Sequence, residues 1–211
     1  MPSTIDGLLR SAGLQPDGVC RWRNSVDSSK AGVYFVSLSP DPKSSAGLRD
    51  APVSDLALLG WIRAVPAMTV DGARATAEAL RARLSAFWLP DESILYIGKA
   101  GGGSSRKTLR QRVREYYRTE LGQPRPHSGG HWLKTLSNLG SLAVHWSECL
   151  EPEETEKGII EEFVRRVSPA SRRALFDPGH PYPFANLELT KGLRKMTGIG
   201  GSRAPREVRL G

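Results

Sequence analysis

The spacing of apolar residues divides the chain into short strands and amphipathic helices. Apolar runs rich in β-branched and aromatic residues predict strands at 32–38, 93–99 and 141–147. Apolar positions that recur every three or four residues predict helices. These cover residues 3–12, 54–64, 69–89, 107–118, 131–139, 152–167 and 189–196. The mixture predicts a small α/β domain of the α+β type.

The stretch between the first two strands is long enough to form an inserted helical subdomain, at about 39–92. Within it, Thr69 is placed to cap a helix that Pro90 ends. We therefore expect an N-terminal extension over 1–31, a central domain over 32–188 that contains this insertion, and a basic C-terminal tail over 189–211. Residues 20–23 of the extension fit either an edge strand or a surface aromatic segment.

The composition favours a polyanionic partner. Thirty Lys and Arg residues oppose twenty-two Asp and Glu residues, which gives a formal charge of +8 and a pI near 9.8. DNA, RNA or an anionic membrane surface would suit such a charge. The alternative is a protein without a polyanionic partner, in which Arg merely replaces Lys at the surface. The two cysteines lack metal-ligand spacing. No signal-peptide pattern and no apolar run near 18 residues is present, so a soluble, cytoplasmic protein without membrane contact is expected.

Three polar features stand on otherwise apolar stripes or at a strand end. Arg112 shares its helical stripe with Leu109 and Tyr116, and Glu156 shares one with Ile159. The third feature, the pair Tyr96 and Lys99, ends a strand before the glycine-serine loop 101–105. A buried charge is costly unless it is paired or binds a metal. Two readings follow: Arg112 and Glu156 form one structural ion pair, or Glu156 holds Mg²⁺ while Arg112 and Lys99 meet phosphate oxygens.

Other candidates are open to more than one reading. The remaining face of the basic helix either contacts a nucleic-acid backbone or is simply solvated; its residues are Arg106, Lys107, Arg110 and Arg114. His131 either contacts phosphate, caps a helix or lies in a solvated loop. Tyr34, taken alone, is an ordinary sheet tyrosine.

Five segments follow one another in the order found in GIY-YIG nucleases. They are Gly32-Val33-Tyr34, Tyr96-Ile97-Gly98-Lys99-Ala100, the basic helix 109–117, the segment 155–163 around Glu156, and Pro183-Phe184-Ala185-Asn186. Each match is weak alone, but the ordered set is fairly specific, and the chain resembles the GIY-YIG nuclease superfamily. The family joins its two tyrosine strands by a short hairpin, whereas here 61 residues lie between Tyr34 and Tyr96.

The resemblance implies a small three-stranded antiparallel sheet flanked by helices, here with a helical insertion between the first two strands. It implies that Glu156 binds one divalent metal ion, Mg²⁺ or Mn²⁺, and that Tyr34 activates or orients the attacking water. The other implied site residues are Tyr96, which lines the site, Lys99, which assists the water or a tyrosine, Arg112, which stabilises phosphate charge, Tyr116 beside the scissile phosphate, and Asn186, which holds the metal-bearing helix end or a phosphate.

The expected function is that of a metal-dependent endonuclease that hydrolyses phosphodiester bonds of double-stranded DNA, of the restriction or defence type. One alternative is a repair or recombination nuclease that acts on structured or damaged DNA. Another is a catalytically silent nucleic-acid-binding module. Cleavage of both strands by a protein with a single site would imply a homodimer.

Overall fold

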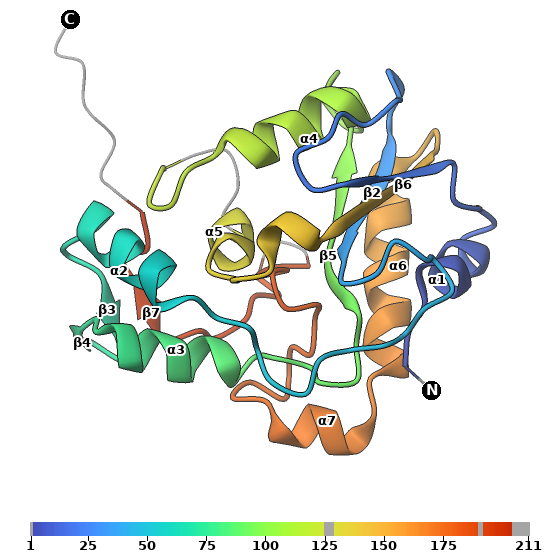
Figure 1. Cartoon of the computed structure of the whole chain (residues 1–211). Helices are drawn as coiled ribbons and strands as arrows, with labels where there is room; N and C mark the ends of the chain where they lie inside the picture. The colour runs from blue at the N-terminus through green and yellow to red at the C-terminus, as the bar shows by residue number, and fades with distance from the viewer. Residues whose placement is uncertain (1, 125–128, 190–191, 204–211) are drawn as a thin grey trace, which may run out of the picture.

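The computed structural model describes residues 2–124, 129–189 and 192–203, which form a mixed α+β fold around a four-stranded antiparallel sheet (Figure 1). In chain order the elements are α1 (Ile5–Ser11), β1 (Gly18–Arg21), β2 (Gly32–Ser37), α2 (Asp55–Ala64), β3 (Thr69–Val70), β4 (Ala73–Arg74), α3 (Ala77–Ser85), β5 (Ile94–Ala100), α4 (Leu109–Arg118), α5 (Gly129–Lys134), the 3-10 turn η1 (Leu139–Ser141), β6 (Ala143–Glu148), α6 (Pro152–Arg166), α7 (Pro169–Ala174) and β7 (Ile199–Gly200).

The main sheet has one strand more than expected. Its order is β1-β6-β2-β5, with β2 paired to β5 on one side and to β6 on the other. The fourth strand, β1, pairs antiparallel with β6, which settles Cys20 and Arg21 as part of an edge strand, while Trp22 is buried. Helix α1 packs on α6. Residues 2–31 are therefore packed into the sheet domain through β1 and α1.

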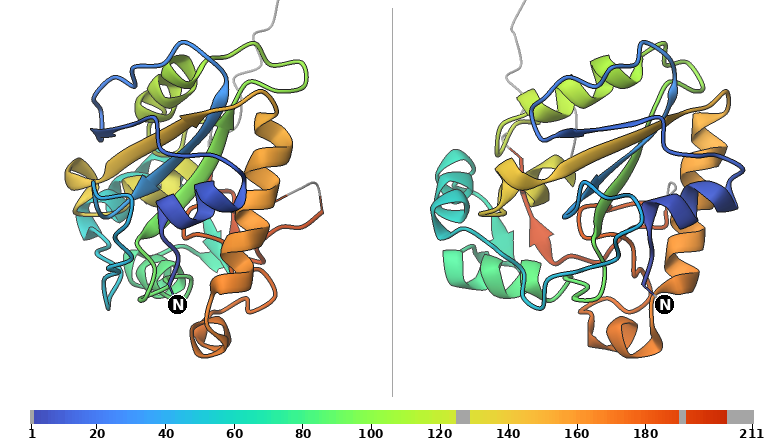
Figure 2. Two further views of the ribbon diagram at one scale, coloured as in Figure 1. Left: turned by 90° about the vertical axis from the view of Figure 1, so that its right-hand side faces the viewer. Right: turned by 45° about the vertical axis from the view of Figure 1, so that its right-hand side comes forward.

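Two helices cover opposite faces of this sheet. Helix α6 packs on the face that carries Val33 and Phe35, and α4 packs on the face that carries Tyr34 and Val36. Figure 2 shows the strands between these two helices. Because alternate residues of a strand point to opposite faces, β2 is buried on both sides along its whole length. Strand β5 is an outer strand of the sheet, so side chains from the two faces can meet at its edge.

The insertion contains a hairpin where one continuous helix was expected. Strands β3 and β4 pair across a turn at Asp71 and Gly72, whose φ angles are +51° and +80°. Asp-Gly favours this left-handed turn, and the turn overrides the helical spacing of the apolar residues around it. The helix starts later, at α3, and its cap is Thr76, whose hydroxyl accepts a hydrogen bond from Ala79 N–H. Thr69 is therefore not a helix cap.

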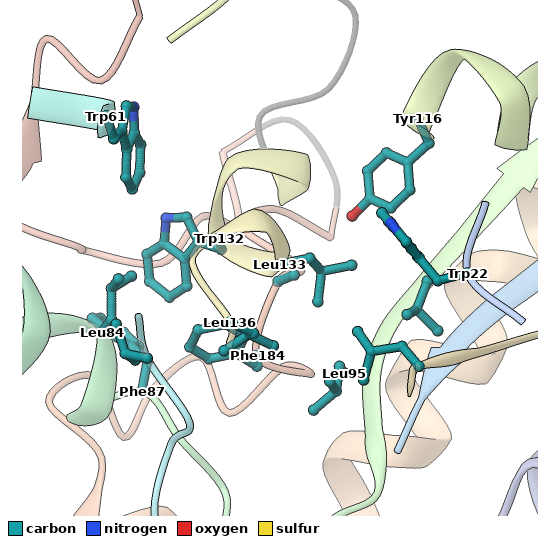
Figure 3. Packing of buried hydrophobic residues seen from close by; sticks show 14 of the residues in the cluster. Trp22, Trp61, Leu84, Phe87, Leu95, Tyr116, Trp132, Leu133, Leu136 and Phe184 are labelled. Carbon is teal, nitrogen blue, oxygen red and sulfur yellow. The ribbon is translucent and has the colours of Figure 1, made fainter. Parts of the chain in front are cut away.

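The insertion shares its core with the rest of the domain. Figure 3 shows buried side chains running from Trp61 of α2, through Trp132 of α5, to Trp22 and Tyr116. The C-terminal strand β7 also pairs with β3 of the insertion. The insertion is thus packed into the same domain as the main sheet.

The C-terminal third differs from expectation at two points. It contains a helix that the apolar spacing did not predict, α7, which Ser168 caps and of which Pro169 is the first residue. No helix forms within the described part of 189–196. Instead Gly192 adopts φ +95°, and Lys195 N–H donates to the carbonyl of Leu187. Residues 190, 191 and 204–211 of the basic tail lie outside the described residues.

None of the helices in the described part of the chain is long and apolar enough to cross a bilayer.

Candidate active site

Three tyrosines from three elements form one cluster on the α4 face of the sheet. The ring centroids of Tyr34 and Tyr96 are 5.8 Å apart, and the Tyr96 and Tyr116 rings stack at 5.0 Å. Tyr34 and Tyr116 also meet edge to face at 6.3 Å. The insertion leaves this geometry intact, because β2 and β5 still pair directly, with Tyr34 opposite Gly98. The structure thus brings together the two tyrosines that lie 61 residues apart in the sequence.

Two glycines of the sequence pattern are sterically required here. A Cβ atom on Gly98 would lie 2.5 Å from Cε1 of Tyr96 and 2.9 Å from the hydroxyl oxygen of Tyr34, closer than real Cβ contacts. A Cβ atom on Gly32 would lie 2.2 Å from the carbonyl oxygen of Ser147 on β6. Gly98 makes room for the tyrosine rings, and Gly32 allows close strand approach.

Charged side chains gather beside the tyrosines, at the outer edge of β5. Lys99 of β5 pairs with Glu153 of α6 at 2.8 Å, and Arg112 of α4 lies 3.8 Å from Glu115. Glu156 lies one turn beyond Glu153 and interacts electrostatically with both Lys99 and Arg112. Glu156 makes no hydrogen bond and no ion pair with any residue that the structure describes. The structural Arg112–Glu156 ion pair, one of the two readings of the sequence, is not what the described residues form.

Burial acts strongly on Glu156. Loss of water raises the pKa of its carboxyl from 4.5 to about 7, the nearby cations Lys99 and Arg112 oppose this, and the negative charge of Glu153 adds to it. The group therefore changes charge near neutral pH. A carboxylate without a hydrogen-bonded partner in a partly buried position is free to bind a cation.

The phenols are held neutral. Burial raises the pKa of Tyr34 and Tyr116 well above 10 and that of Tyr96 to about 12. The hydroxyl of Tyr34 interacts with Tyr96 but forms no hydrogen bond of full geometry with a described residue. Tyr34 is thus better suited to orienting a water molecule than to taking its proton, unless a bound cation lowers its pKa.

Asn186 is bonded to the β5 strand of the site. Its side-chain oxygen accepts a hydrogen bond from Ile97 N–H at 2.8 Å, and its side-chain nitrogen donates to the Ile97 carbonyl at 2.7 Å. Ala185 N–H donates to the carbonyl of Leu95. The chain from Pro183 thus covers the open edge of β5. The oxygen and the nitrogen of the Asn186 side chain both bond to Ile97. Asn186 therefore holds the strand that carries Tyr96 and Lys99, and is not placed to bind metal or phosphate.

A pocket opens beside these groups. It has a volume of about 460 Å³, and its lining consists of Lys99, the glycine-serine loop 101–105, Lys107, Arg112 and Glu153. Gly101, Gly102 and Gly103 all have positive φ angles, so the loop follows a path that other residues rarely adopt. Three cations, one acid and the glycine-serine loop line this pocket. A phosphate group of a larger substrate fits this lining.

The candidate nucleic-acid residues divide into three groups. Arg106 and Arg114 are exposed and make no ion pair within the described residues. Lys107 is paired with Glu115 at 2.7 Å, and Arg110 with Asp27 at 2.9 Å.

His131 forms the third group, because it is buried. Its ring stacks on Trp61, and its two nitrogens lie within hydrogen-bonding distance of Gly122 N–H and the Gln123 carbonyl. Burial lowers the pKa of its imidazole to about 4. His131 is thus a core residue, and its assignment to a nucleic-acid surface is wrong.

The sequence reasoning missed Glu153. This residue stands three positions before Glu156, on the same side of α6, and is the ion-pair partner of Lys99. The spacing of three residues from Glu156 could have identified Glu153 from the sequence. Glu153 sets the position of Lys99 and adds negative charge next to Glu156.

The residues suit a hard divalent cation held by one protein carboxylate. Among the described residues no three His, Cys, Asp or Glu side chains converge in a metal-binding group. Of the described acids beside Lys99 and Arg112, Glu153 and Glu115 are paired and Glu156 is not, so the site offers one unpaired carboxylate. This arrangement is the one expected for Mg²⁺, since this ion keeps several waters and takes further oxygens from substrate phosphate. A structural zinc or calcium cage does not fit these residues.

Comparison of the chain with protein-family models, with curated protein sequences and with solved structures gave no match.

Proposed function

We propose that this protein is a divalent-metal-dependent endonuclease that hydrolyses phosphodiester bonds of double-stranded DNA through a GIY-YIG-type site. The observation that carries the proposal is the unpaired Glu156 carboxylate, which lies near Lys99, Arg112 and the tyrosine cluster. In this proposal β6, β2 and β5 are the three-stranded nuclease core, and β1 and the insertion are additions to it.

The residues would divide the chemistry as follows. Glu156 would hold Mg²⁺ or Mn²⁺, and the bound ion would supply Lewis-acid stabilisation of the phosphate. Tyr34 would orient the attacking water through its hydroxyl. Lys99 would lower the proton affinity of that water or of a phenol, and Arg112 would stabilise the negative charge that builds on the phosphate oxygens.

Two further tyrosines complete the proposed site. The stacked rings of Tyr96 and Tyr116 would wall it and limit the entry of bulk water. Tyr116 would place its hydroxyl beside the scissile phosphate.

The charge arrangement supports phosphate chemistry over a purely structural role. A structural buried carboxylate normally accepts hydrogen bonds that offset its loss of water. Glu156 accepts none from the described residues, although two cations lie close enough to act on its pKa. Such a site keeps its charge available for a ligand.

The proposal is tested by incubating the purified protein with supercoiled plasmid, linear duplex, branched duplex and lesion-bearing duplex. We expect cleavage with Mg²⁺ or Mn²⁺ and none with EDTA. Equal cleavage of plasmid and linear duplex fits the restriction or defence type, whereas cleavage confined to branched or damaged DNA indicates a repair nuclease.

The Arg112→Ala variant should reduce the single-turnover rate at least about 10²-fold, because a preplaced cation on the phosphate is lost. The exposed Arg173→Ala on α7 is the matched control and should cleave as the wild type does. Salt-sensitive DNA binding without cleavage under any of these conditions would show the silent binding module instead.

A further inference from the structure

The flank of α4 that faces away from Arg112 carries a second concentration of positive charge. Successive helical residues are about 100° apart, so Arg114 is turned by about 200° from Arg112 and only about 40° from Arg110 and Arg118. The side of α4 that carries Arg112 meets the candidate active site. The opposite side has not been given a role.

A groove runs along this flank. One hollow of about 710 Å³ is lined by Arg23, Arg114, Tyr117, Arg118, Glu120, Leu121, Lys134 and Leu139. A second hollow of about 270 Å³ is lined by Arg23, Asn24, Ser25, Val26, Arg110, Arg114 and Tyr117. The two share Arg23, Arg114 and Tyr117, so they form one surface, which we call the α4 flank groove.

The positive charge of this groove is largely uncompensated. Arg23, Arg114 and Arg118 make no ion pair with any described residue, and the larger hollow contains one acid, Glu120. Lys134 is half-buried, and its ammonium donates only to the carbonyl of Tyr117, at 3.1 Å. Burial, and then the charge of Arg23, lowers the pKa of Lys134 to about 8. Cations that repel one another and outnumber the acids around them suit an anionic ligand.

The turn that contains Arg23 has a strained backbone. Arg23 has φ +74°, a conformation that costs a residue other than glycine of the order of 1 kcal/mol. The neighbouring Trp22 fixes this turn, because its ring packs edge-on against both Tyr116 and Tyr117. Tyr116 belongs to the candidate active site and Tyr117 lines the groove. The Trp22 ring therefore contacts one tyrosine of the groove and one of the candidate active site.

We propose that the α4 flank groove binds a backbone phosphate of duplex DNA, distinct from the phosphate at Arg112. An α-helix with its side chains is about 10–12 Å across, and the major groove of DNA is about 12 Å wide. A helix with cations on both flanks can therefore meet the phosphates of both strands. The inference rests on the proposed function in one respect, that DNA is the substrate.

The test uses the double variant Arg114→Gln/Arg118→Gln. Its control is Arg74→Gln/Arg173→Gln, which removes the same charge from exposed positions on β4 and α7, remote from α4 (Figure 1). Affinity for a 30-base-pair DNA duplex is measured by fluorescence anisotropy in EDTA over a range of salt concentrations. Thermal unfolding of each variant checks that it is folded.

For the groove variant we expect about tenfold weaker binding and a salt slope smaller by about one, which corresponds to one lost phosphate contact. The control should bind with the wild-type slope. A neutral methylphosphonate scanned along the duplex should weaken wild-type binding at one position outside the cleavage site, and should have no added effect there in the groove variant. Wild-type affinity and slope in the groove variant, or equal losses in the control, would overturn the proposal.

The same variants separate this inference from the proposed nuclease. If the wild type binds but does not cut with Mg²⁺, while the groove variant still loses salt slope, the groove stands and the nuclease assignment falls. If the wild type cuts and the groove variant binds normally, the groove falls and the nuclease assignment stands. Absence of DNA binding by the wild type overturns both.

Discussion

Glu156 and Lys195 are two ionisable groups that burial affects in opposite directions and that the fold treats differently. Burial raises the pKa of Glu156 from 4.5 to about 7 and lowers that of Lys195 from 10.5 to about 7. The Lys195 ammonium donates to the carbonyls of Pro183 and Phe184 at 2.9 and 3.0 Å, and lies 5.5 Å from the rings of Phe87 and Trp132. Glu156 has no hydrogen-bonded partner among the described residues.

The difference separates a charge that the fold matches with partners from one that it leaves unmatched. Lys195 is matched by carbonyls and aromatic faces, so its burial stabilises one arrangement of the C-terminal segment. Glu156 keeps its oxygens unmatched, which costs stability and leaves them available to a ligand. The following variants test this contrast, beginning with the largest expected effect.

Lys195→Ala should lower the free energy of unfolding by about 3–5 kcal/mol, because it leaves the Phe184 carbonyl without a donor, removes one of the two hydrogen bonds to the Pro183 carbonyl and opens a cavity among aromatic rings. Denaturant unfolding measures this. Lys195→Met keeps the volume and should cost less, which separates the packing loss from the hydrogen bonds. A loss below about 1 kcal/mol for Lys195→Ala would show that the partners of Lys195 do not stabilise the fold, and would contradict its contrast with Glu156.

Asn186→Ala should cost about 2–3 kcal/mol, since it removes two buried hydrogen bonds to Ile97. It should also slow cleavage, because β5 carries Tyr96 and Lys99. Asn186→Asp should not rescue either property at pH 8, as its carboxylate would face the Ile97 carbonyl. Urea unfolding and single-turnover cleavage provide the readouts. Normal stability together with lost cleavage would make Asn186 a direct participant instead.

Local patterns predicted the strands of Tyr34 and Tyr96 and the helices of Arg112 and Glu156, because each is an apolar run or stripe of its own. The hairpin at Asp71-Gly72 was also readable from the turn residues, but the apolar spacing around it imitated a helix. Strand β1 carries little apolar pattern, because it lies at the sheet edge.

The environments of several candidate residues could not be predicted from local pattern. Asn186 bonds to Ile97 across 89 positions of sequence, and His131 is buried by contacts with the distant insertion. These contacts exist only in the folded chain. The pairing of Lys99 with Glu153 rather than Glu156 is likewise a matter of three-dimensional position.

Glu156→Gln should stabilise the protein at pH 8 and leave it unchanged at pH 4.5. The folded-state pKa of Glu156, about 7, lies above its unfolded value of 4.5, so the cost of the charge develops as pH rises from 4.5 to 7 and is complete above 7. Allowing for partial exposure, we expect a gain of about 1–2 kcal/mol at pH 8.

The control for this stability measurement is Glu154→Gln, an exposed neighbour on α6 that should change stability little at either pH. Denaturant unfolding at the two pH values gives both numbers. A loss of stability in Glu156→Gln at pH 8 would mean that the carboxylate already has a stabilising partner.

The smallest expected effect is a pair of opposite shifts in the pH dependence of cleavage. If cleavage needs ionised Glu156, its rate should rise with pH through about 7 in the absence of other limits. Lys99→Met removes a cation that lowers the pKa of Glu156, so the midpoint should move up; Glu153→Gln removes an acid that raises it, so the midpoint should move down. Shifts below about one pH unit are expected, in single-turnover rates from pH 5.5 to 9. Shifts in the same direction would contradict the charge arrangement described for the site.

The most direct measurement is the single-turnover rate of Mg²⁺-dependent DNA cleavage by Glu156→Gln at pH 8, with DNA affinity measured in parallel and Glu154→Gln as the matched control. The account predicts a rate at least about 10³-fold below the wild type, with affinity for DNA retained and the control unaffected. Cleavage by Glu156→Gln at the wild-type rate would contradict it.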